Sequence, residues 1–183
     1  MNFWRQVLLQ LRVGGQGGRI EVGAGVCLLG QVRVRGPGLV RIGPGARLDG
    51  RLARIELITG PGAELTLGEG VVIDEGASIE AALSVRIGAR CRLGAFCKIL
   101  DNDMHLVEGA RSSLERASQE HELTPGSHPV TLEEDVTLGP RAIILPGAHL
   151  GRGTRVKPGA VFSHRTRAGA VVVGHPARVH FPA

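Results

Sequence analysis

Aromatic residues are almost absent from this sequence, whose 183 residues include no Tyr, one Trp and four Phe. A close-packed core therefore has to be built from Val, Ile, Leu and Ala. Glycine is abundant, at 28 residues, and it accepts the positive φ of tight turns at little steric cost. The composition favours short aliphatic strands joined by frequent turns over long helices. The length fits a single domain spanning residues 1–183.

Cysteine and long apolar runs are also scarce. Cys27, Cys91 and Cys97 are odd in number and form no CxxC pair. Neither a disulfide framework nor a zinc knuckle is therefore indicated, and a reducing cytoplasm is the expected compartment. The apolar stretch at residues 7–11 is much shorter than a membrane span and lacks the long apolar core of a secretory signal. The sequence thus predicts no transmembrane segment.

Lysine occurs only at Lys98 and Lys157, so the net charge of +5 comes almost wholly from Arg. A positive field favours a polyanion or a phosphorylated cofactor as a partner. Most of the Arg residues stand singly, however, and no dense basic run is interleaved with the aromatic residues that stack on bases. Nucleic acid is therefore not an expected partner.

A period of six residues is the most informative pattern in the chain. An apolar residue recurs at Leu132, Leu138, Ile144, Leu150, Val156 and Phe162. Small or β-branched residues stand four places after the first five of these, at Val136, Ala142, Ala148, Thr154 and Ala160. The same rhythm runs through residues 67–79 and, after a slip of two residues, through residues 87–99. Cys91 and Cys97 fall in the small-residue slot, which predicts packed core thiols rather than nucleophiles.

Six residues match neither the 3.6-residue period of a helix nor the two-residue period of a simple strand. Such a unit provides one short strand and one corner, so three units close a triangular coil of about 18 residues. Stacked coils pair as parallel strands about 4.8 Å apart. The sequence therefore predicts an all-β solenoid of about seven triangular coils.

One polar, irregular stretch interrupts the rhythm and is predicted to be an extruded loop at residues 105–131. Loops of this length inside a compact repeat are often functional. Near the N-terminus, apolar residues within 2–12 recur at helical spacing. They predict a short helix within residues 1–14 that caps the first coil, and an anchor on a membrane surface is the alternative interpretation.

Three segments together carry a family resemblance. The repeats at residues 129–147 include Leu-Gly-Pro-Arg-Ala-Ile-Ile-Leu-Pro-Gly. Residues 101–105 read Asp-Asn-Asp-Met-His, similar to the Asp-x-Asp-x-His of lipopolysaccharide and capsule O-acetyltransferases. Residues 174–178 read Gly-His-Pro-Ala-Arg, similar to a Gly-Asn-Pro-Ala-Lys/Arg ending. Residues 65–180 thus resemble the hexapeptide-repeat acyltransferases, in their sugar and polysaccharide O-acetyltransferase branch.

The resemblance implies a left-handed parallel β-helix that assembles as a homotrimer, with each active site between neighbouring prisms. It also implies direct transfer of acetyl from acetyl-CoA to a hydroxyl of a saccharide or lipid-linked saccharide, without a metal. His105 matches the general base of the family, a role that suits an imidazole. Asp103, ahead of Asp101, would orient its ring, and both also suit a turn. Asp74 and Asp101 are the expected acceptor-contacting residues.

By the same alignment, coenzyme A would lie along the C-terminal coils. Its expected contacts are Arg141, Ala142, Pro158, Gly159, Ser163, His164 and Arg178. Arg178 would meet a phosphate, as a guanidinium suits. Two positions depart from the family: Thr137 replaces a Trp, and Pro140 has no N–H where a backbone donor would stabilise the oxyanion.

Two alternatives stay open. A trimeric β-helix scaffold without catalytic activity is favoured by Thr137 and Pro140. A zinc enzyme of the β-helix carbonic anhydrase type would need three His residues around one metal, with His105 joined by His121 or His128. The sequence does not specify which acceptor is used.

Overall fold

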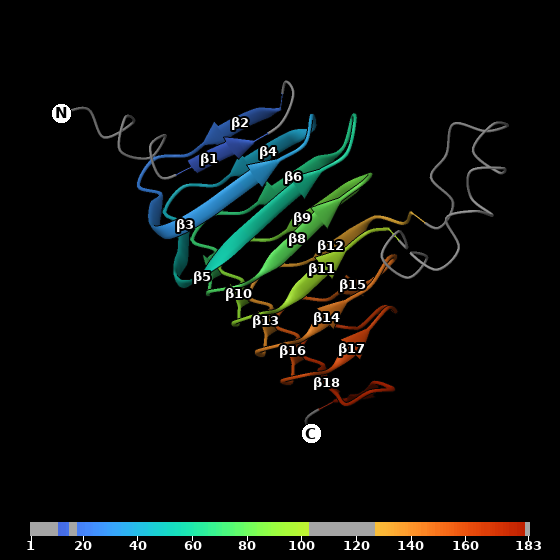
Figure 1. The fold of residues 1–183 in the computed structure, drawn as a ribbon. Helices are drawn as coiled ribbons and strands as arrows, with labels where there is room; N and C mark the ends of the chain where they lie inside the picture. Colours follow the sequence, from blue (N-terminus) through green and yellow to red (C-terminus); the bar gives the residue numbers. More distant parts are fainter. Residues whose placement is uncertain (1–10, 15–17, 103–126, 182–183) are drawn as a thin grey trace, which may run out of the picture.

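The computed structural model describes residues 11–14, 18–102 and 127–181, and every regular element in these ranges is a β-strand. The strands stack in parallel, rung upon rung, along the axis of a prism (Figure 1). The expected fold class, a left-handed parallel β-helix, is confirmed. Among the described residues no helix is long and apolar enough to cross a membrane.

Three faces make up the prism. Face one comprises β2 (Arg19–Val22), β4 (Leu39–Ile42), β6 (Glu64–Leu67), β9 (Ser84–Ile87), β12 (Val130–Leu132) and β15 (His149–Leu150), in that order along the axis. A bridge from His149 to Arg165 adds one more rung to this face.

Face two comprises the first part of β3 (Cys27–Arg35) and of β5 (Arg47–Thr59), then β7 (Val72–Ile73), β10 (Arg92–Leu93), β13 (Thr137–Leu138), β16 (Arg155–Val156) and β18 (Val171–Val173). Face three comprises β1 (Leu11–Gly14), the remainder of β3 and β5, β8 (Ser78–Ala81), β11 (Lys98–Leu100), β14 (Ile143–Ile144) and β17 (Val161–Phe162). The final strand, β19 (Arg178–His180), pairs antiparallel with β18.

The interior of the prism is filled by the residues that the six-residue period singled out. Leu132, Leu138, Ile144, Leu150, Val156 and Phe162 are each at most 3% exposed. The small-residue slots at Val136, Ala142, Ala148, Thr154 and Ala160 are also buried, as are Cys91 and Cys97. The coils make about six turns, against the seven expected. The period therefore identified both the core and its triangular geometry.

Two boundaries differ from the sequence prediction. Leu11–Gly14 is a strand paired with Val32–Arg35 of β3, so the expected helix does not extend over these residues. The reason is that the free edge of β3 offers backbone partners that a helix would leave unpaired. Residues 1–10 lie outside the described residues. The extruded loop ends earlier than residue 131, because Val130 and Thr131 already pair in β12.

Candidate functional site

The edge between faces two and three, here called the second corner, is a stack of turns at residues 74–77, 94–97, 139–142 and 157–160. Each turn is joined to the previous one by a backbone hydrogen bond: Phe96 N–H donates to the Glu75 carbonyl (2.8 Å), Arg141 N–H to Ala95 (2.8 Å) and Gly159 N–H to Pro140 (3.0 Å). The fold therefore brings the predicted acceptor residue Asp74 onto the same edge as the predicted coenzyme contacts Arg141, Pro158 and Gly159.

Asp74 stands at the start of its turn, and its N–H donates to the Leu93 carbonyl (2.9 Å). Partial burial raises the pKa of its carboxyl above the ordinary value, and the neighbouring charges of Glu75 and Asp49 act in the same direction. The Arg47 and Arg92 guanidiniums act weakly against these. Asp74 thus holds its proton to a higher pH than a solvated Asp does.

Phe96 is a residue of the second corner that the sequence interpretation missed. Its side chain is 49% exposed, and its ring lies against Gly76, where an added Cβ would fall 2.4 Å from a ring carbon. Its φ is +58°, as is that of Arg141 in the next turn, in a slot that Gly76 and Gly159 fill in the other two turns. A bulky residue in this conformation costs about 1–2 kcal/mol, and such strain clusters at functional sites. The missing glycine at this slot was the available signal.

The backbone donor for an oxyanion that the sequence lacks at Pro140 is not supplied by neighbouring residues of the same turn. Pro140 has no N–H, and its carbonyl already accepts from Gly159. The next N–H groups along the turn are also committed, since Arg141 donates to Ala95 (2.8 Å) and Ala142 to Gly139 (3.1 Å). This turn therefore has no free backbone donor for a developing negative charge.

The remaining predicted coenzyme contacts lie on neighbouring parts of the lower coils. Ala142 is fully buried, with its side chain in the core, so only its backbone is available. Ser163 and His164 follow β17 at the far edge of face three, where the His164 ring meets Phe162 edge-on at 6.1 Å. Arg178 is exposed in β19, opposite Val173 of β18. The predicted set thus runs from the second corner across face three, except for Arg178, which lies on the final strand beside face two.

Asp101 lies at the edge between faces three and one, here called the third corner, where the interrupted repeat begins. Its carboxylate is fully buried and accepts from three consecutive N–H groups of the coil before: Ala82 (2.6 Å), Leu83 (2.8 Å) and Ser84 (2.7 Å). Its carbonyl accepts from the N–H of His128 (2.8 Å), which joins the two ends of the interrupting segment.

This arrangement explains the two-residue slip in the repeat. Leu65 pairs with Val85 twenty residues on, whereas Thr131 pairs with His149 eighteen residues on. The two additional residues widen the third corner at residues 82–84 and turn three N–H groups toward Asp101. Because both carboxylate oxygens are engaged with backbone, Asp101 builds a turn, and its predicted contact with an acceptor finds no support. Asp103 and His105 lie outside the described residues, and their roles stay predictions.

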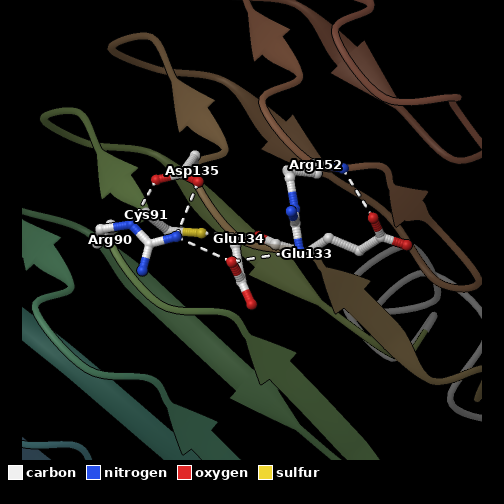
Figure 2. Close-up of polar contacts among 6 residues, drawn as sticks. All are labelled: Arg90, Cys91, Glu133, Glu134, Asp135 and Arg152. Atoms are coloured by element: carbon white, nitrogen blue, oxygen red, sulfur yellow. Dashed lines mark hydrogen bonds and ion pairs between the residues drawn. The ribbon is translucent and has the colours of Figure 1, made fainter.

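The edge between faces one and two, the first corner, carries a charged cluster (Figure 2). Arg90 contacts Glu134 (2.8 Å) and Asp135 (2.7 Å), and Arg152 contacts Glu134 (3.4 Å). The buried thiol of Cys91 donates to the Glu133 carbonyl (3.0 Å). Burial raises the pKa of Cys91 to about 11 and that of Cys97 to about 12. Thiols with such pKa values are poor nucleophiles at neutral pH.

Metal ligands do not gather in the part of the chain that the structure covers. No group of three His, Cys, Asp or Glu side chains there could hold a metal ion. The three cysteines are all free. His105 and His121 fall outside these ranges, so the zinc alternative is not tested by this result.

Comparison with known proteins gives a short sequence match and an extensive structural one. No family model matches the chain. A 55-residue segment is 46% identical to a 2,3,4,5-tetrahydropyridine-2,6-dicarboxylate N-acetyltransferase of Staphylococcus aureus, covering 30% of this chain and 23% of that protein. The chain thus spans under a quarter of the relative it matches.

Solved structures extend the likeness over most of the chain. The polySia-specific acetyltransferase NeuO matches 93% of the chain and 78% of its own, with a TM-score of 0.67 and 16% identity. The polysialic acid O-acetyltransferase OatWY matches 93% and 88%, with a TM-score of 0.61 and 18% identity. The chain therefore has the hexapeptide-repeat, left-handed β-helix fold on which these acetyltransferases are built.

Proposed function

We propose that the protein is an acetyltransferase that moves an acetyl group from acetyl-CoA to a hydroxyl of a saccharide. The observation that carries the proposal is the second corner, where Asp74, Phe96, Arg141 and Gly159 stand on successive turns of one edge. The fold and the local match with an N-acetyltransferase support the acyl-transfer chemistry. The names of the polysialic acid O-acetyltransferases support a saccharide acceptor.

The proposed reaction is a direct transfer. An imidazole, assigned to His105, takes the proton of the acceptor hydroxyl as its oxygen bonds to the thioester carbon. The carbon–sulfur bond then breaks, and the imidazolium returns the proton to the departing thiolate. An acetyl ester and free coenzyme A are the products. The buried, weakly acidic thiols of Cys91 and Cys97 support this route over an acyl-cysteine intermediate.

The second corner would hold the two substrates side by side. Asp74 can accept a hydrogen bond from an acceptor hydroxyl, and the half-exposed ring of Phe96 offers an apolar surface beside it. Arg141 would lie along the coenzyme, whose arm would continue toward Ser163 and His164. Arg178 would meet a phosphate as a bidentate donor. Homotrimeric assembly and a cytoplasmic location are part of the same proposal.

A coenzyme A release assay with a panel of saccharides tests the proposal. His105→Ala should lower the rate of acetyl transfer by roughly 10²–10⁴-fold, the usual worth of a general base. His121→Ala, which removes an imidazole from the same interrupting segment, is the matched control and should keep the rate. An unchanged rate in His105→Ala would remove the base from this position.

The non-catalytic scaffold is the second candidate, and the committed N–H groups around Pro140 favour it. Calorimetry with acetyl-CoA separates the two. Binding at micromolar ligand supports the enzyme, whereas no binding at millimolar ligand supports the scaffold. Amines belong in the acceptor panel, because the matched relative is named as an N-acetyltransferase. Turnover with amines alone would replace the hydroxyl in the proposal.

A further inference from the structure

Charge is distributed very unevenly along the chain. From Val136 to the C-terminus there is no Asp or Glu, while seven cationic residues occur there: Arg141, Arg152, Arg155, Lys157, Arg165, Arg167 and Arg178. The preceding residues contain 17 acidic and 15 basic side chains. The whole excess of positive charge therefore belongs to the lower coils, from β13 through β18 as labelled in Figure 1 and on to the C-terminus.

Face two carries two exposed cations that form no ion pair within the described ranges, Arg155 in the acid-free stretch and Arg92 one rung before it. Register places Arg92, Thr137 and Arg155 in one outward column on β10, β13 and β16. Both Arg92 and Arg155 are exposed, and neither forms an ion pair with a described residue. Arg47 occupies the same column higher on the prism, but its guanidinium pairs with Asp49 (3.2 Å). In this column Arg47 is thus held in an ion pair, whereas Arg92, whose charge acts weakly on Asp74, and Arg155 are not.

Cationic side chains also flank this column. Lys157 and Arg141 stand on the second corner and Arg167 on the first corner, all exposed. Two rungs separate Arg92 from Arg155, a distance of about 10 Å at the usual strand spacing. A rigid surface with cations at this spacing suits an extended chain that carries anions at intervals, because each guanidinium can bind a carboxylate in bidentate fashion.

We propose that the lower part of face two, formed by β10, β13, β16 and β18, binds an acidic polysaccharide, so that the acceptor of the proposed transfer is a carboxylate-bearing saccharide polymer. The choice of acceptor rests on the proposed function, whereas the binding surface does not. Single-stranded nucleic acid is the other extended polyanion, but it is gripped by aromatic side chains between the cations. The outward column of face two, from Arg92 through Thr137 and Arg155 to Val171, has none, and the half-exposed ring of Phe96 lies outside this column, on the flanking second corner.

Calorimetry of the full chain with polygalacturonate at low salt tests the surface. The double variant Arg92→Gln/Arg155→Gln should weaken binding by about tenfold, the worth of two exposed charge contacts. The matched control is Arg47→Gln/Arg51→Gln, which removes the same charge from guanidiniums that already pair with Asp49. It should change the affinity by less than about twofold.

Four outcomes would overturn the proposal. Equal weakening in both double variants would mean that only net charge matters, and equal binding of neutral dextran would mean that charge does not. Tighter binding of oligothymidylate than of polygalacturonate would assign the surface to nucleic acid. Displacement of the polymer by saturating coenzyme A would assign the cations to the coenzyme. A protein that binds the polymer but acetylates nothing would sink the proposed function and leave the surface standing.

Discussion

At the scale of single residues, one buried carboxylate holds the corner at which the interrupting segment begins. The Asp101 side chain accepts hydrogen bonds from the three N–H groups of the widened turn at residues 82–84. A buried carboxylate in this position is stable because charge-assisted hydrogen bonds to N–H groups compensate its loss of hydration. The interrupting segment therefore starts from a fixed point on the prism.

Asp101→Ala should lower the free energy of unfolding by about 3 kcal/mol or more, since each buried N–H left without a partner costs about 1–3 kcal/mol. Asp101→Asn keeps one acceptor oxygen and should cost less. Urea denaturation followed by circular dichroism measures both. A loss within about 0.5 kcal/mol for the Ala variant would contradict the role given to this side chain.

The core thiols give a pH dependence. Their folded pKa values, about 11 and about 12, lie above the value of 9.0 for a free thiol, so only the unfolded chain ionises between pH 9 and pH 11. Their contribution to stability is complete below pH 9 and is lost as pH rises, by up to about 1.4 kcal/mol per pH unit for each thiol. Denaturation at pH 8 and pH 10 should show this loss in the wild type. Cys91→Ala/Cys97→Ala, the comparison variant, should lose less.

At the scale of elements, the corners are what close the triangle. In the first corner a residue with positive φ recurs in successive turns, at Gly70, Arg90, Asp135, Gly153 and Gly169. Each of these donates its N–H to a carbonyl of the coil before; for example, Gly153 donates to Glu134 (2.9 Å). The corner is thus a continuous ladder that parallels the strand ladders of the faces.

Two glycines of the first corner should respond differently to the same added methyl. Gly153 has φ +67° and nothing within 4 Å of an added Cβ, whereas a Cβ on Gly88 would lie 2.6 Å from the Glu133 carbonyl carbon. Gly153→Ala should cost about 1–2 kcal/mol through backbone strain alone. Gly88→Ala should cost more, because neighbouring backbone has to move. Equal losses in chemical denaturation would refute this distinction.

Sequence reasoning succeeded where the six-residue period was regular and failed where local pairing overrode it. The period placed the core of β12 to β17 because each inward side chain and each small corner residue recurs without insertion. In the upper coils β3 and β5 cross a corner without a break: Gly30 pairs with Gly50, but Val32 pairs with Ile55. Such a bulge adds residues to one strand only. A fixed six-residue period therefore cannot predict the pairing of these two strands.

Residues of the candidate site could be named from the sequence only where they align with motif positions of the family that the chain resembles. Alignment assigned Asp74 to the acceptor and Arg141 to the coenzyme, and the fold brings both residues to one edge. Phe96 was missed because a bulky residue in a glycine slot has no sequence signature apart from the repeat itself. The role of Asp101 was left open between a turn and a ligand contact, since composition cannot show which N–H groups a carboxylate will meet.

At the scale of the whole molecule, the charge gradient sets the behaviour toward anions. Coenzyme A carries several negatively charged phosphates, which the positively charged lower coils would attract. Because salt screens this attraction, added salt should weaken coenzyme binding. Its dissociation constant should rise as the salt concentration is raised from low to high. Arg178→Gln should weaken binding at low salt and flatten this dependence, as titration calorimetry can measure. An identical salt dependence in the variant would remove Arg178 from the coenzyme site.

The hydrogen bond between His128 and the Asp101 carbonyl has an evolutionary consequence. Val85 and Val130 pair as neighbours although 45 residues separate them in the chain, so the coils on either side meet as if nothing had been inserted. The sequence between Asp101 and His128 can therefore be lengthened, shortened or exchanged while the prism keeps its register. New specificities can therefore be grafted onto this scaffold by replacing one continuous segment, at little risk to folding.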